Sequence, residues 1–161
     1  MDSMQRPILL LGVLPLVVSC AFGSHNRSDS MCDQIARFAE SAQIGVAHSV
    51  TLRGGWGGDT PNILMTHDCE HSGYDPGKQL CDYLVPNTSW EFGQYNARSA
   101  VACLDSPERR SVIRKLNQDE WPIEITSSMR ILKDKRIIVT VRFSTSNLSV
   151  LTLTATRNPH D

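Results

Sequence analysis

The chain has 161 residues, with 16 Lys and Arg against 17 Asp and Glu, so its formal net charge at pH 7 is −1. This length is typical of one domain and is sufficient for a substantial hydrophobic core. The near-neutral charge argues against a general nucleic-acid binder, which needs a strongly basic surface. We therefore expect no nucleic-acid partner.

The first 19 residues are predicted to be a signal peptide. Arg6 precedes an apolar run at residues 8–18, which is shorter than the roughly 20 residues of a membrane-spanning helix. A cation, a short apolar run and small residues in this order are typical of an export signal. Residues 17–20, Val-Val-Ser-Cys, resemble the bacterial lipobox. That resemblance implies cleavage before Cys20 and lipidation of this cysteine.

Ordinary signal-peptide cleavage before Ser24 is an alternative, which predicts a soluble periplasmic or secreted protein. In the lipidated form, Ala21 provides no aspartate-type retention signal, so we expect anchoring to the outer membrane with the domain facing the periplasm. The lipid is then the only expected contact with the membrane. Residues 20–30 are polar and predict a tether, and residues 31–161 form the single domain.

The cysteine count supports this interpretation. If Cys20 is lipidated, Cys32, Cys69, Cys81 and Cys103 remain. An even number of cysteines in an exported protein predicts disulfides. Of the three possible connectivities we favour Cys69–Cys81, which closes a short loop, together with Cys32–Cys103, which joins the first helix to a later one.

The first part of the domain is predicted to combine one helix with two strands. Apolar residues at helical spacing predict an amphipathic helix at residues 31–42, with Ser30 as its N-cap. Alternating apolar residues predict a strand at residues 44–52. The glycine-rich residues 53–59 are expected to end it as a flexible loop, and residues 63–65 predict a short second strand.

Three helices are predicted next. Asp75-Pro76 is a typical helix start, and Pro86 is expected to end that helix. Thr88 and Glu91 have the spacing of a capping box for the second helix. Ser106-Pro107 repeats the cap-and-proline pattern for the third.

The C-terminal part changes to a period of two. Alternating apolar residues predict strands at 123–131, 137–143 and 151–155, joined by short polar turns. Such strands are typical of an antiparallel meander. The fold class is therefore α+β: an antiparallel sheet with a C-terminal three-strand meander, helices packed on one face, and two disulfides.

Residues 67–71, His-Asp-Cys-Glu-His, hold the densest group of reactive side chains. In an extended strand His67, Cys69 and His71 point the same way, as in a transition-metal site. Cys69 is instead expected in a disulfide, so we predict no metal, no cofactor and no catalytic residue here. A metal-dependent periplasmic hydrolase using His48, His67 and His71 is kept as an alternative.

Two features are candidates for binding a protein partner. Trp56 stands between Gly55 and Gly57, and tryptophan is enriched at binding hot spots; packing of Trp56 on the sheet is the alternative. Arg110 and Arg114 belong to a basic helix, which suits either an anionic partner or plain solvation. We predict that these five residues contact the partner.

These features together favour a non-catalytic, periplasm-facing lipoprotein that binds another protein. Small exported bacterial proteins of this general form include immunity proteins and inhibitors of cell-wall-degrading enzymes. By this analogy of form, the most concrete hypothesis is an immunity protein or inhibitor that neutralises a secreted antibacterial cell-wall hydrolase. A metal-dependent hydrolase and a purely structural envelope lipoprotein are the competing hypotheses.

Overall fold

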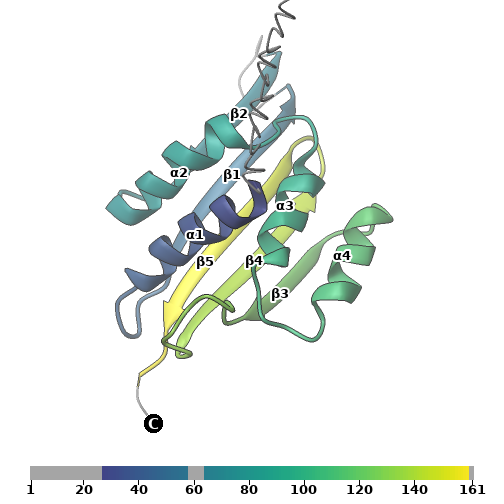
Figure 1. Ribbon diagram of the computed structural model, residues 1–161. Coiled ribbons are helices and arrows are strands. Elements are labelled where there is room, and N and C mark those ends of the chain that lie inside the picture. Colours follow the sequence, from purple (N-terminus) through teal and green to yellow (C-terminus); the bar gives the residue numbers. More distant parts are fainter. Residues whose placement is uncertain (1–26, 58–63, 160–161) are drawn as a thin grey trace, which may run out of the picture.

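A computed structural model describes residues 27–57 and 64–159. Within these residues the chain forms four helices and one five-stranded antiparallel sheet, and Figure 1 shows α1, α2 and α3 lying over one face of that sheet. The α+β prediction is thus confirmed. In chain order the elements are α1 (Arg27–Glu40), β1 (His48–Trp56), β2 (Met65–Glu70), α2 (Asp75–Asn87), α3 (Gly93–Ala102), α4 (Arg109–Asn117), β3 (Ile123–Ser127), β4 (Ile137–Thr145) and β5 (Ser149–Arg157).

The strand order in the sheet is β2-β1-β5-β4-β3. The last three strands form the predicted meander, and β1 pairs with the free edge of β5. In this register Val50, Leu153, Val141 and Ile125 lie side by side across four strands, and all four are buried. Because side chains alternate between the faces of a sheet, this row faces the helices, and the polar residues between them face away.

The helices complete one hydrophobic core against this face. The α3 helix contacts three strands, β1, β4 and β5. It can lie close to them because Ala97 and Ala100, which are fully buried, are small. The α1 and α2 helices contribute larger side chains to the core, including Phe38 and Leu84. The other face of the sheet has no helix over it in the described residues.

Both predicted disulfides are present. Cys32–Cys103 joins α1 to the residue after α3, and Cys69–Cys81 joins β2 to α2. This pairing uses all four cysteines that follow Cys20.

The positions of β1 and β2 differ from the prediction. Ile44 forms only an isolated bridge with Arg157, and β1 begins at His48 and continues through Gly54 and Gly55 to Trp56. Residues 53–56 are therefore strand and not loop. At Gly54 an added Cβ would lie 2.6 Å from the carbonyl oxygen of Trp90. This glycine permits a close approach of two backbones, a use of glycine that a strand tolerates.

The ends of the helices also differ. The α1 helix begins at Arg27, before the predicted cap, since serine lowers helix stability by only a few tenths of a kcal/mol. Pro86 lies inside the last turn of α2. Thr88 does not cap α3, which begins at Gly93; its hydroxyl donates instead to the carbonyl of Leu84 (2.6 Å) at the end of α2.

The other boundaries shift by a few residues. The α4 helix begins at Arg109, because residues 106–108 form a turn. The β3 strand ends at Ser127, and Met129 beyond it forms only an isolated bridge with Leu104. None of the described helices has both the length and the apolar character needed to cross a membrane.

Candidate protein-binding site

Large hydrophobic side chains are exposed where β1 ends and β2 begins, at the upper end of the molecule in Figure 1. Trp56 is 66% exposed, Leu64 83% and Met65 45%. Trp56 and Met65 are partners in the register of the two strands, so their side chains lie on the same face. We call Trp56, Leu64, Met65 and the adjacent Trp90 the hydrophobic tip.

Trp90 reaches the tip from the connection between α2 and α3. Its ring packs edge-to-face on Trp56, with 4.8 Å between ring centroids. The backbone of Trp90 lies directly over Gly54, where any side chain would displace it. Asn96 fixes the connection, because its carboxamide accepts from the Ser89 amide (3.0 Å) and donates to the Ser89 carbonyl (2.6 Å). Trp56 therefore packs on Trp90, whose own position is fixed by these contacts.

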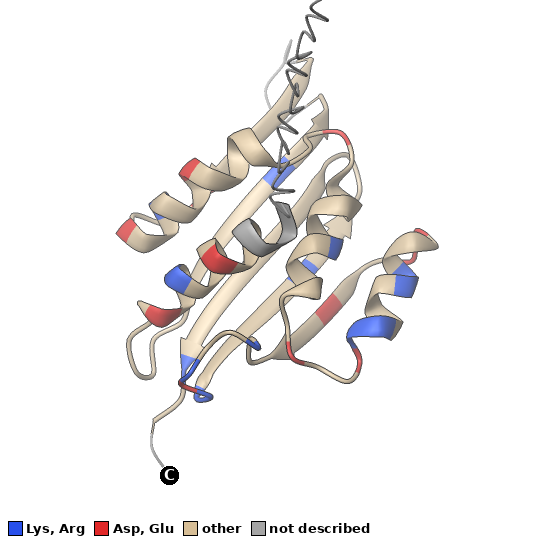
Figure 2. Ribbon diagram, in the orientation of Figure 1, with Lys and Arg blue, Asp and Glu red and all other residues tan. Residues whose placement is uncertain are grey.

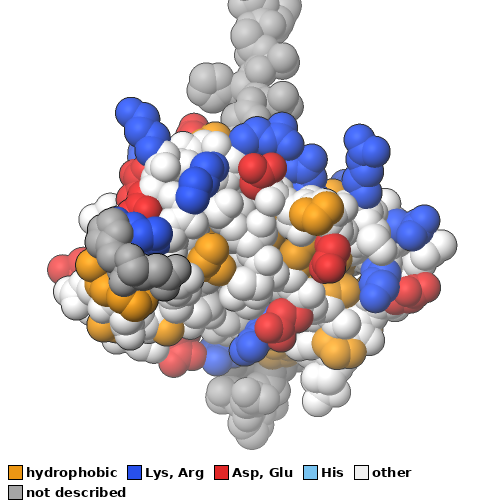
Figure 3. All heavy atoms as spheres, turned by 90° about the horizontal axis from the view of Figure 1, so that it is seen from below, with side chains coloured by type: hydrophobic (Ala, Val, Ile, Leu, Met, Phe, Trp, Pro, Cys, Tyr) orange, Lys and Arg blue, Asp and Glu red, His pale blue; other side chains and the backbone are white. Residues whose placement is uncertain are grey.

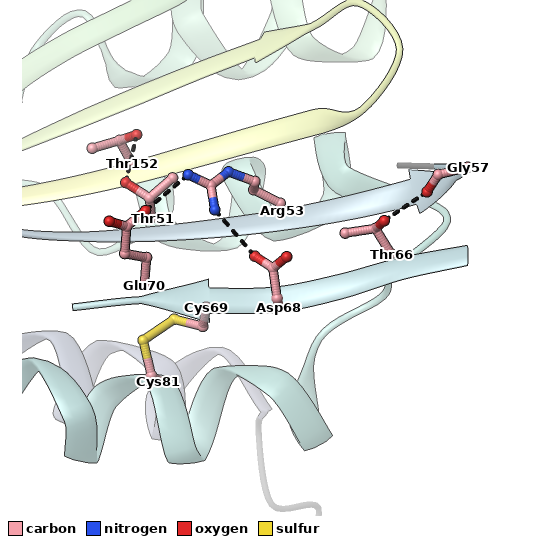
Figure 4. A network of polar contacts seen from close by, with 9 residues as sticks. All are labelled: Thr51, Arg53, Gly57, Thr66, Asp68, Cys69, Glu70, Cys81 and Thr152. Atoms are coloured by element: carbon pink, nitrogen blue, oxygen red, sulfur yellow. Dashed lines mark hydrogen bonds and ion pairs between the residues drawn. A yellow bond between two sulfur atoms is a disulfide. The ribbon is translucent and has the colours of Figure 1, made fainter. Parts of the chain in front are cut away.

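The opposite face of the same hairpin is held by polar contacts (Figure 4). Arg53 of β1 donates to Glu70 (2.8 Å) and Asp68 (3.4 Å) of β2. The hydrogen bond to Glu70, reinforced by the charges of both carboxylates, raises the pKa of Arg53. Nearer the tip, the Thr66 hydroxyl donates to the Gly57 carbonyl (2.6 Å). These contacts fix the two strands that position Trp56 and Met65.

The glycines beside Trp56 have backbone roles. Gly57 has φ of +80°, a left-handed conformation that glycine adopts readily. Its amide donates to the Leu64 carbonyl (2.9 Å), which closes the pairing of β1 with β2. At Gly55 an added Cβ would lie 3.1 Å from the Leu148 side chain. Both predicted glycines therefore shape the tip, and neither offers a side chain to a partner.

His67 links the hairpin to the same connection. Its Nε2 lies 3.3 Å from the Thr88 hydroxyl oxygen. Partial burial lowers the pKa of His67, since the charged imidazolium loses hydration, and the neighbouring Asp68 opposes this effect.

The depressed pKa of His67 predicts a pH effect on stability. Above the unfolded value of 6.5 the imidazole is neutral in both states, and its contribution is fully present. As pH falls from 6.5 through the folded pKa, the unfolded chain takes up the proton more readily, so stability is lost. An NMR titration of the His67 ring is expected to give a midpoint below 6.5. A midpoint at or above 6.5 would contradict this prediction.

The structure separates the basic helix from the tip. Arg110 and Arg114 lie on α4, which packs on α3 and β3, whereas Trp56 ends β1, and β5 and β4 lie between β1 and β3. Strands spaced about 4.8 Å apart put β3 roughly 14 Å from β1. Figure 2 shows basic positions and no acidic position along α4. In the described part of the chain neither arginine forms an ion pair, so the two surfaces are distinct.

The three histidines of the hydrolase alternative occupy different places. His48 stacks on Tyr74, with ring centroids 3.6 Å apart. His67 and His71 are four residues apart along the chain at β2, which corresponds to about 13 Å in a strand, and Cys69 between them is in a disulfide. Across residues 27–57 and 64–159, no three His, Cys, Asp or Glu side chains are grouped closely enough to hold a metal ion.

Sequence reasoning missed three members of the hydrophobic tip: Trp90, Leu64 and Met65. Trp90 could have been noticed as an aromatic residue between two predicted helices. It was missed because Thr88 and Glu91, on either side of it, were interpreted as a capping box. Cys20, the predicted lipidation site, lies outside the described residues. No protein-family model, curated protein sequence or solved structure is significantly similar to this chain.

Proposed function

We propose that this chain is an exported, periplasm-facing lipoprotein that binds another protein through the hydrophobic tip. The observation that supports this most directly is the exposure of Trp56, Leu64 and Met65 at one end of the sheet. Grouped exposed hydrophobic residues mark interaction surfaces. Because Trp56 already packs on Trp90, little side-chain entropy is lost when a partner covers it.

The opposite end of the molecule has a different surface. Seen from below in Figure 3, it carries basic and acidic side chains among its hydrophobic ones, and the largest hydrophobic group lies at the left edge of the view. Ile131, which is 50% exposed, lies in the connection between β3 and β4 at that end. Ile44 and Val46, between α1 and β1, are also exposed, at 55% and 40%. The tip has the more exposed side chains and includes Trp56, so it is the better candidate for a hydrophobic contact, and Ile131 is a matched control for it.

The compartment is part of the proposal. Two disulfides are typical of an oxidising environment such as the periplasm. The signal peptide at residues 1–19, lipidation of Cys20 and anchoring to the outer membrane complete the proposed route. A secreted antibacterial cell-wall hydrolase acts in the same space, and a tethered domain that covers its working surface would protect the cell. We therefore propose an immunity protein or inhibitor of such an enzyme.

The test is direct binding and protection with Trp56→Ala. Losing a hot-spot tryptophan typically costs about 2 kcal/mol or more, so affinity for a cell-wall hydrolase encoded beside this gene is expected to fall about 30-fold or more. Calorimetry measures the affinity, and survival of cells exposed to the hydrolase measures protection. Ile131→Ala is expected to change neither. Absence of binding and protection by the unmodified chain, or equal effects of both variants, would count against the proposal.

A further inference from the structure

A second feature lies beside the hydrophobic tip, between the start of α1, the end of α2 and α3. It is a cavity of about 400 Å³, within the roughly 300–1,000 Å³ range of small-molecule sites. The residues that matter for its chemistry are Tyr83, Asn87, Thr88, Ser89, Tyr95 and Asn96.

Hydrogen bonds hold the walls of this cavity in place. Asn96 is itself buried, and both ends of its carboxamide bind the backbone of Ser89. Asn87 donates through its Nδ2 to the Tyr83 carbonyl (2.8 Å), and Thr88 donates to the Leu84 carbonyl (2.6 Å). Walls that are already ordered favour ligand binding, because little conformational entropy is lost when the ligand binds.

One tyrosine forms an exposed wall. Tyr95 is 49% exposed, yet its ring is held by Phe92, at 5.6 Å between ring centroids, and by the Arg98 guanidinium, 5.0 Å from the ring centroid. Arg98 donates to Asn117 and does not line the cavity. The Arg98 guanidinium thus covers part of the Tyr95 ring from outside the described lining, and the rest of the ring stays exposed to a ligand.

The groups left for a ligand are neutral. All nine described lining residues are uncharged, so this described part of the lining supplies neither the cations that bind phosphate nor the carboxylates that bind metal ions. It offers phenol hydroxyls and the Ser99 hydroxyl, which can donate or accept, and the Asn87 carboxamide oxygen, which accepts. Two tyrosine rings add apolar surface.

We infer that this cavity binds one sugar ring of an uncharged glycan. A pyranose has an apolar C–H face that packs on an aromatic ring, and a rim of hydroxyls that needs neutral donors and acceptors. The cavity supplies both kinds of surface. This role goes beyond the proposed protein binding, because it uses residues outside the hydrophobic tip.

The experiment uses the exported chain carrying Cys20→Ser and three probes: tetramers of β-1,4-linked N-acetylglucosamine, of cellulose and of maltose. NMR titration is expected to show saturable binding of at least one, with the largest shifts at Asn87, Ser89 and Tyr95. Tyr95→Ala is expected to weaken that binding about tenfold, since the stacking surface is lost.

Two variants serve as controls. Tyr95→Phe keeps the ring and is expected to retain most of the affinity, while Ile131→Ala is expected to retain all of it. The melting temperature of each variant is measured to show that it is folded. The inference is overturned if none of the three tetramers binds saturably, or if folded Tyr95→Ala binds as well as the unmodified chain. Neither result bears on hydrolase binding by the tip, which is measured separately with Trp56→Ala.

Discussion

Replacing Cys32 and Cys103 together by alanine is expected to lower the free energy of unfolding by about 4 kcal/mol, because a bridge across some 70 residues strongly restricts the unfolded chain. The two cysteines are separated by 71 residues in the sequence. Cys103 is buried and Cys32 packs against the core, so the lost sulfur atoms add a small packing cost. A domain of this size is stable by only about 5–15 kcal/mol, so the variant should retain only about 1–11 kcal/mol of stability.

The second disulfide provides the matched control. Cys69 and Cys81 are 12 residues apart, so replacing them by alanine is expected to cost about 3 kcal/mol in the same model. Urea unfolding of both double variants, in the exported chain carrying Cys20→Ser, measures the two losses. If the short-loop variant loses as much as or more than the long-loop variant, restriction of the unfolded chain is not the main contribution of these bridges.

Gly93→Ala is expected to destabilise the protein by about 1–3 kcal/mol, although alanine is normally the better helix residue. Helix propensity favours alanine over glycine by about 1 kcal/mol at most. At the first residue of α3, however, an added Cβ would overlap the Cβ of Ser149 on β5, and the ring of Phe143 lies 3.2 Å away. A Cβ is fixed to its backbone and cannot rotate aside, so overpacking should outweigh propensity.

Ser149→Gly tests this explanation by removing the other member of the clash. Alone it is expected to cost about 0.5–1 kcal/mol, as glycine does in a strand. Combined with Gly93→Ala it should cost less than the sum of the two single losses, by about 0.5–3 kcal/mol, since contacting sites couple by about this amount. Urea unfolding of the two single variants and the double variant gives the coupling. Simple additivity would show that the cost of Gly93→Ala comes from elsewhere.

Two close contacts, one at Gly93 and one at Gly54, connect stability with the proposed partner site. Gly93 lets α3 lie on β5, and Gly54 lets the backbone of Trp90 lie on β1. Trp90 in turn supports Trp56. We therefore expect the proposed partner surface to depend on glycines that contribute no side chain to it.

The sequence by itself determined the features that depend on local periodicity and on the number and positions of the cysteines. Alternation in the last third of the chain was sufficient for the meander of β3, β4 and β5, because a strand with one buried face must alternate. The even count of later cysteines predicted two bridges. The preferred pairing was also confirmed, since a helix residue such as Cys32 and a later helix end such as Cys103 meet when helices share one face of a sheet.

Tertiary structure decided the features that depend on residues far apart in the chain. Gly54 and Gly55 resemble a loop locally, yet both pair with β2, and Gly54 also pairs with β5, which keeps them in a strand. The backbone of Trp90 requires glycine at position 54. Thr88 has the spacing of a helix cap, but its hydroxyl binds the preceding helix. The hydrophobic tip likewise joins Trp56 to Trp90 across 34 positions of the sequence (90 − 56). Local patterns reflect conformational preferences worth about 1 kcal/mol or less per residue. Packing between distant segments contributes more free energy and therefore overrides them.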